Sequence, residues 1–105
     1  MDRLSQLKQF AVEDPDDPFN LYALALEYLK TDPVKAISFF DQLVQTHTNY
    51  LPTYYPYAHL LIEQKENEKA EQIFLHGIEI AKSRNETKTL KELQGAYQDW
   101  VYERE

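Results

Sequence analysis

The sequence predicts an all-α fold in which antiparallel helix pairs stack into a helical repeat of about six helices. Three observations support this fold. The 105-residue chain contains only two glycines, so it has little material for hairpin turns or phosphate-binding loops. Its apolar residues recur at the three- and four-residue spacing of amphipathic helices. The chain also repeats itself after 34 residues, which is typical of stacked helix pairs.

The repeat appears when residues 18–51 are written above the residues that follow them. Identical residues then pair at an offset of 34. We therefore expect a first repeat over residues 18–51 and a second over residues 52–84. The identical pairs are Pro18 with Pro52, Leu26 with Leu60, Lys35 with Lys69, Ala36 with Ala70, and Phe40 with Phe74.

An opening helix is expected within residues 1–14, before the acidic turn EDPDDP. The two helices of the first repeat then share one start signal, because Asp17 precedes Pro18 and Asp32 precedes Pro33. An Asp at the N-cap accepts a hydrogen bond from a free backbone N–H, and Pro loses nothing at the first helical position. The apolar stripes of the three helices are Leu4, Leu7, Phe10 and Ala11, then Leu21, Leu24, Ala25 and Tyr28, then Ala36, Ile37, Phe40, Leu43 and Val44.

The second repeat begins in the stretch YLPTYYPYAHLL, residues 50–61. A helix that began at Pro52 would place Pro56 in its second turn, where it would remove a backbone hydrogen bond. With Thr53 as the N-cap, Pro56 is the third helical residue and its missing N–H costs nothing. The expected stripes are Tyr54, Tyr57, Ala58 and Leu61 in this helix, and Ala70, Ile73, Phe74, Gly77, Ile78 and Ala81 in the next, which Asn67 is expected to cap.

A closing helix is expected over residues 86–103. It carries an apolar stripe and turns its polar side chains outward to solvent. Because the turns are short and no long linker separates the elements, residues 1–105 are expected to form a single domain. The apolar stripe is Leu90, Leu93, Ala96, Tyr97, Trp100 and Val101, and the polar side chains are Lys88, Lys91, Glu92, Gln94, Gln98 and Asp99.

This pattern resembles the tetratricopeptide repeat, which reads W-x2-L-G-x2-Y, then A-x3-F, then P. Ala25 and Ala58 replace the Gly of that pattern, and the closing Pro is absent. The resemblance, closest to small stand-alone bacterial-type members, implies a right-handed α-solenoid in which residues 1–14 correspond to half a repeat and residues 86–103 to a capping helix. The matching segments are Leu21-x2-Leu24-Ala25-x2-Tyr28 with Ala36-x3-Phe40, and Tyr54-x2-Tyr57-Ala58-x2-Leu61 with Ala70-x3-Phe74.

The resemblance also implies an adaptor or scaffold function, in which the first helix of each pair lines a concave groove that binds a peptide or helical segment of another protein. The spacing of Tyr22, Leu26 and Leu29 supports such a second stripe independently of the family. Tyr22 and Tyr55 could instead pack against a neighbouring helix. The groove positions carried over are Phe19, Tyr22, Leu26, Leu29 and Lys30 in the first repeat, and Pro52, Tyr55, His59, Ile62 and Glu63 in the second.

The expected partner is an apolar or aromatic protein segment with positive charge near Glu63. Family members that hold the acidic tails of chaperones place Lys, Asn and Arg in the groove, and this chain has Tyr22, Leu26, Tyr55 and His59 at those places. Binding of acidic tails is therefore not implied. The alternative is a self-associating unit, a homodimer that closes through the aromatic groove or the Trp100 face.

Composition argues against other functions. A net charge of -7 and a pI near 4.9 oppose binding to nucleic acid or anionic membranes. No stretch approaches the roughly 18 apolar residues of a membrane span, and the first residues lack the apolar run of a signal peptide, so a cytoplasmic location is expected. Because the chain has no cysteine and His47, His59 and His76 show no metal-ligand spacing, we expect no catalytic, metal or cofactor site and no enzyme activity.

Overall fold

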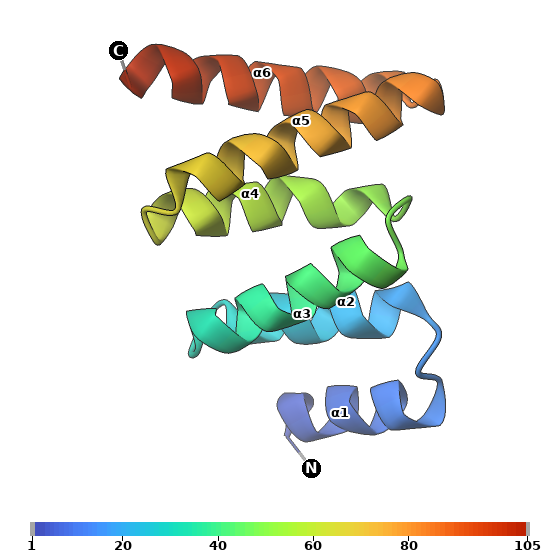
Figure 1. The fold of residues 1–105 in the computed structure, drawn as a ribbon. Coiled ribbons are helices and arrows are strands. Elements are labelled where there is room, and N and C mark those ends of the chain that lie inside the picture. Colours follow the sequence, from blue (N-terminus) through green and yellow to red (C-terminus); the bar gives the residue numbers. More distant parts are fainter. Residues whose placement is uncertain (1, 105) are drawn as a thin grey trace. The chain divides into compact units, whose positions relative to one another are not determined.

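A computed structural model describes residues 2–104, which contain helices and turns and no strand (Figure 1). Six α-helices and one short 3₁₀ helix form in this range. The predicted all-α helical repeat is thereby confirmed. The elements are α1 (Arg3–Glu13), α2 (Pro18–Tyr28), α3 (Pro33–Thr46), the 3₁₀ helix η1 (Leu51–Thr53), α4 (Tyr54–Glu63), α5 (Asn67–Ser83) and α6 (Thr87–Arg104).

The chain divides after Thr53 into two compact units, and each is described by itself. The first unit contains α1, α2, α3 and η1, and the second contains α4, α5 and α6. The single domain over residues 1–105 and the right-handed stacking of its repeats remain predictions. Residues 1 and 105, which that domain includes, lie outside the described residues.

The Asp-Pro pairs start α2 and α3 as predicted. The side chain of Asp17 accepts a hydrogen bond from the backbone N–H of Phe19 at 2.9 Å, and that of Asp32 accepts one from Lys35 at 3.2 Å. Pro18 is the first residue of α2, where its missing N–H leaves no hydrogen bond unmade.

The tyrosine-rich stretch starts α4 at the predicted place, but without the predicted side-chain cap. The helix begins at Tyr54, so Pro56 is its third residue. Thr53 belongs to the 3₁₀ turn that leads into the helix, and its backbone N–H donates to the carbonyl oxygen of Tyr50 at 3.3 Å. Its hydroxyl is buried and finds no hydrogen-bond partner among the described residues, so it does not cap α4.

The start of α5 also differs from the prediction. Asn67 is the first helical residue, Glu66 takes the N-cap position, and no side chain caps the helix. The reason is the backbone of Lys65, whose φ of 62° lies in the left-handed region and reverses the chain just before Glu66. The carbonyl oxygen of Glu66 then accepts the first helical hydrogen bond, from the N–H of Ala70.

In the first unit the core lies between α2 and α3. The small side chains of Ala25 and Ala36 are fully buried there, together with Phe40 and Leu43. Small residues at these positions allow two helices to approach closely, and the aromatic ring fills the space beside them. Helix α1 packs against α2 and buries Leu7.

In the second unit α4 and α6 both pack around α5. Tyr54 and Tyr57 of α4 are fully buried, as is Phe74 of α5. The ring centroid of Phe74 lies 5.7 Å from that of Tyr97 and 5.8 Å from that of Trp100, so α6 covers the ring of Phe74. The Tyr97 hydroxyl also donates a hydrogen bond to the carboxylate of Glu71 on α5, at 2.9 Å. This bond, more than the partial burial of the ring, raises the pKa of Tyr97.

Candidate functional site

A cleft of about 320 Å³ lies beside α2 in the first unit, and we call it the α2 cleft. Four predicted groove residues meet in its lining because they recur at three- and four-residue spacing on one helix face. Leu29, also predicted, is half-buried at the end of α2 and does not line this cleft. The lining residues are Phe19, Tyr22, Ala23, Leu26 and Glu27 of α2, Lys30 in the turn after α2, and Arg3 of α1.

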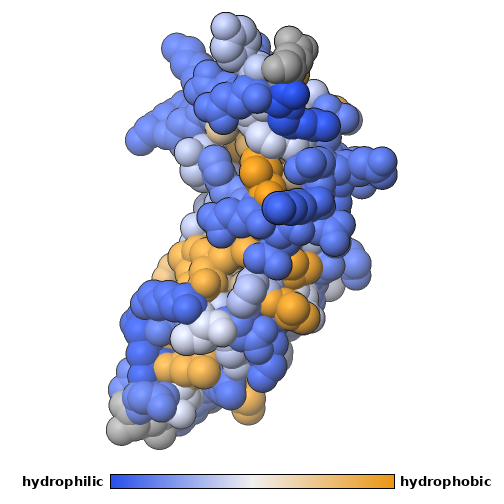
Figure 2. Space-filling view, turned by 90° about the vertical axis from the view of Figure 1, so that its left-hand side faces the viewer, coloured by the Kyte–Doolittle hydropathy of each residue, from blue (hydrophilic) through white to orange (hydrophobic). Residues whose placement is uncertain are grey.

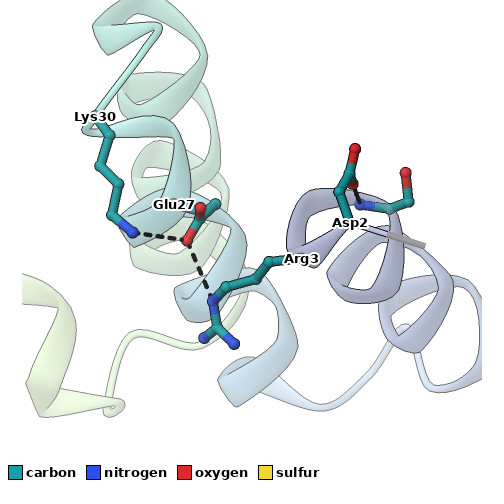
Figure 3. A network of polar contacts seen from close by, with 5 residues as sticks. Asp2, Arg3, Glu27 and Lys30 are labelled. Atoms are coloured by element: carbon teal, nitrogen blue, oxygen red, sulfur yellow. Dashed lines mark hydrogen bonds and ion pairs between the residues drawn. The ribbon is translucent and has the colours of Figure 1, made fainter.

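A carboxylate held by two cations forms the polar side of the α2 cleft (Figure 3). The Oε2 atom of Glu27 lies 3.2 Å from Nε of Arg3 and 3.2 Å from Nζ of Lys30. Such exposed ion pairs each contribute at most about 1 kcal/mol to stability. Their main effect here is to compensate the charge of Glu27 within the chain. The same view shows Asp2, which caps α1 by accepting a hydrogen bond from the backbone N–H of Ser5, and that bond lowers its pKa.

Tyr22 is both packed and accessible from the α2 cleft. Its ring meets the ring of Tyr50 edge-on, with centroids 5.7 Å apart, and the partial burial raises the pKa of Tyr22. The rest of the side chain lines the cleft. Tyr50 precedes η1 and is not part of a helix, so this contact is not the helix packing that the sequence offered as the alternative for Tyr22.

In the second unit, a trough runs between α4 and α6, and we call it the α4–α6 trough. It consists of two adjoining hollows of about 500 and 290 Å³, which share Tyr55, Ala96 and Asp99. The larger hollow is also lined by Lys91, Glu92 and Gly95, and the smaller by His59, Ile62, Trp100 and Glu103. The trough therefore brings together three of the predicted groove residues, Tyr55, His59 and Ile62.

The α4 side of this trough is aromatic. The rings of Tyr55 and His59 lie with their centroids 4.4 Å apart, and the ring of His59 meets Phe74 edge-on at 6.2 Å. Tyr55 is 45% exposed, so it is not a core residue. The predicted residue Glu63 is exposed at the end of α4 and lines neither hollow, and Pro52 is exposed in η1.

The α6 side of the trough was not predicted from the sequence. Lys91, Glu92 and Asp99 are exposed to solvent, as predicted, and they also border the hollow beside Tyr55. The reason is that α6 rests on α5 through its apolar stripe, which leaves the adjacent stripe beside α4. A signal for that stripe exists in the sequence, since Glu92, Ala96, Asp99 and Glu103 recur at i, i+4, i+7 and i+11.

The three histidines contact different partners. A ring nitrogen of His47 lies 2.9 Å from the carbonyl oxygen of Asp16, while His76 lies edge-on to Tyr54 and His59 belongs to the trough. Among residues 2–104, no three His, Cys, Asp or Glu side chains are grouped so that they could hold a metal ion. In the same range, no helix has both the length and the hydropathy needed to cross a bilayer.

Comparisons with known proteins agree with the helical repeat. The family model for the tetratricopeptide repeat matches residues 22–93. The solution NMR structure of a tetratricopeptide repeat domain protein from Salinibacter ruber is 39% identical, with a TM-score of 0.77 over 82% of this chain and 88% of that chain. A crystal structure of a tetratricopeptide repeat domain protein from the same organism is 37% identical, with a TM-score of 0.73 over 78% of this chain and 93% of that chain. None of the curated proteins compared matches.

Proposed function

The chain belongs to the tetratricopeptide repeat family, whose domains mediate interactions between proteins, and on this premise we propose that it is an adaptor or scaffold with two binding surfaces. These surfaces are the α2 cleft and the α4–α6 trough, and each takes up a peptide or helical segment of a partner protein. Proteins with this fold are typically non-enzymatic scaffolds, which agrees with the proposal. The cytoplasmic location expected from the sequence stays a prediction.

The observation that carries the proposal is that exposed aromatic rings lie in hollows. Phe19 in the α2 cleft is 58% exposed and Tyr55 in the trough is 45% exposed, whereas Tyr54, the neighbour of Tyr55, is fully buried. Concave sites with aromatic walls and a few polar groups are where proteins usually bind ligands. A tyrosine offers rigid apolar area and a polar hydroxyl, which suits a surface that is exposed to solvent when free and buried when a partner is bound.

The proposal is tested by capture from the native cell with the full chain and with Tyr55→Ala, His59→Ala and Phe19→Ala. Leu75→Ala is the matched control, because Leu75 of α5 is 47% exposed and lines neither surface. We expect the Tyr55→Ala, His59→Ala and Phe19→Ala proteins to lose a partner that the Leu75→Ala protein retains. The Kd for that partner should be about micromolar, since each surface offers a small interface.

Stability is the necessary second readout for the same variants. Because Tyr55 and Phe19 are half exposed, their replacement should leave the melting temperature within a few degrees of the parent value. Equal capture by the Tyr55→Ala and Leu75→Ala proteins would contradict the trough as a binding surface. A dimer in solution that dissociates on Tyr55→Ala or Trp100→Ala would instead favour self-association.

A further inference from the structure

Two carboxylates of the trough form no ion pair with a cation of the described residues. Asp99 and Glu103 line it, and neither takes part in a hydrogen bond or an ion pair among residues 2–104. The α2 cleft differs, because its carboxylate, Glu27, is held by Arg3 and Lys30. The trough lining as a whole contains three carboxylates and one ammonium group, those of Glu92, Asp99, Glu103 and Lys91.

A tryptophan ring, that of Trp100, borders the same hollow as these carboxylates. The guanidinium of Arg104 lies 4.3 Å from the centroid of the Trp100 ring, so this ring already accepts a guanidinium within the chain. A cation over an indole ring is stabilised by the negative face of the ring. Because Trp100 is buried and already contacts Arg104, Asp99 and Glu103 are the groups that this hollow offers to an arginine or lysine of a partner.

The lining of the larger hollow includes a glycine, Gly95. A β-carbon added to Gly95 would meet no atom within 4 Å, so no packing contact requires a glycine at this position. Glycine inside a helix costs about 1 kcal/mol relative to alanine. Its presence here leaves room beside Tyr55 for part of a bound segment.

We infer that the α4–α6 trough binds a protein segment in which an arginine or lysine stands next to an apolar or aromatic residue. The cation lies against Asp99 and Glu103, and the apolar side chain lies against Tyr55 and His59. This inference rests on the proposed function and specifies its partner. An acidic segment would be repelled by these carboxylates, and a purely apolar one would leave them without a counter-charge.

A library of random 12-residue peptides displayed on phage, selected on the full chain, tests the inference without a known partner. We expect the selected peptides to share an arginine or lysine beside an apolar or aromatic residue. One selected peptide is then synthesised with arginine and, as its neutral isostere, with citrulline. The citrulline peptide should bind about fivefold more weakly, which corresponds to about 1 kcal/mol for an exposed charge pair.

To test whether Asp99 and Glu103 bind the arginine, the affinity of each peptide is measured for the parent and for the double variant Asp99→Asn/Glu103→Gln. This variant should bind the arginine peptide about fivefold more weakly than the parent does, and should bind the citrulline peptide with the parent's affinity. The reason is that removal of either charge breaks the same interaction. The matched control is Glu68→Gln/Glu79→Gln, which removes the same charge from exposed positions on α5 outside the trough. It should bind both peptides as the parent does.

The outcomes separate the two proposals. Peptides that depend on Tyr55 but bind equally well with arginine and citrulline would overturn the inference and leave the proposed function standing. Failure to select any peptide whose binding depends on Tyr55 or Phe19 would overturn the proposed function and this inference with it. Thermal melting monitored by circular dichroism must first show that each variant is folded.

Discussion

Gly77 of α5 faces Tyr54 of α4 so closely that a β-carbon on residue 77 would lie 2.8 Å from both Cβ and Cγ of Tyr54. These atoms are next to the backbone of α4, so they cannot move aside as the end of a flexible side chain could. The same β-carbon would lie 3.1 Å from a methyl group of Leu93 on α6. Gly77 therefore sets the distance at which α4 and α6 pack on α5.

We predict that Gly77→Ala destabilises the protein, although alanine is the better helix former. Overpacking a tight contact costs about 1–3 kcal/mol, which exceeds the gain of about 1 kcal/mol in helix propensity. The melting temperature should fall by several degrees. A melting temperature equal to or above that of the parent would show that α4 and α5 are not in this close contact.

The same substitution at Gly95 should have the opposite effect on stability. Because its β-carbon meets nothing, Gly95→Ala should gain up to about 1 kcal/mol of helix propensity, or a rise of about 4–8 °C in melting temperature. If the trough is a binding surface, affinity for the selected peptides should fall at the same time. A stabilised variant with unchanged affinity would show that bound segments do not use the space above residue 95.

Leucine at either of two buried alanines should destabilise the helix pair to which it belongs. Ala36 lies in the first unit and Ala70 in the second, and both are fully buried. Each leucine, which has three more carbons than alanine, should lower the free energy of unfolding by about 1–3 kcal/mol, measured by urea denaturation. Val34→Leu, at an exposed position of α3, is the control and should change stability little. If Ala36→Leu and Val34→Leu unfolded alike, the close helix contact at Ala36 would be disproved.

Stability should fall in alkali because of Tyr54. Burial raises the pKa of this phenol to about 12, from 10 when exposed. The folded state therefore favours the neutral form, and that contribution is fully present below about pH 10 and lost as the pH rises towards 12. The loss amounts to roughly 3 kcal/mol. Urea denaturation at pH 8 and pH 11 should show about half of this loss, because pH 11 lies midway between the two pKa values.

Two phenylalanine variants provide the comparison for the alkaline experiment. Tyr54→Phe cannot ionise and should lose less stability between pH 8 and pH 11, though some loss remains because the pKa values of Tyr22, Tyr50 and Tyr97 are also raised. Tyr102→Phe, at an exposed position, should follow the parent profile. A Tyr54→Phe protein with the full parental loss would place the sensitive group elsewhere.

Exposed apolar residues alone do not locate the binding surfaces. On the face shown in Figure 2, hydrophobic side chains form separate patches among mostly hydrophilic ones. Several exposed apolar residues, such as Val34 and Leu75, line neither the α2 cleft nor the trough. Isolated exposed apolar residues are common in soluble domains, so the hollow, and not the exposure, singles out Phe19 and Tyr55.

The sequence by itself determined the helices and most of the residues that each one buries, although Phe10 of the stripe predicted for α1 is 51% exposed. An N-cap, a proline at the first helical position and an apolar stripe all act within a few residues of chain, so Asp17-Pro18 and the stripe of α2 could be read directly. The 34-residue offset then predicted the second helix pair from the first. Helical spacing also placed Tyr22, Leu26 and Leu29 beside the buried stripe of α2, whereas Phe19 and Tyr55 came from the resemblance to the tetratricopeptide repeat.

Only the tertiary structure decided what those faces meet. Asp99 is exposed on α6, as the sequence predicted, but its place in a trough with Tyr55 follows from the packing of α6 on α5, which turns the neighbouring stripe of α6 towards α4. The compensation of Glu27 by Arg3 likewise joins residues 24 positions apart. Helical periodicity says which side chains share a face, because it follows from local backbone hydrogen bonds. It does not say which distant helix covers that face, because this depends on packing between segments far apart in the sequence.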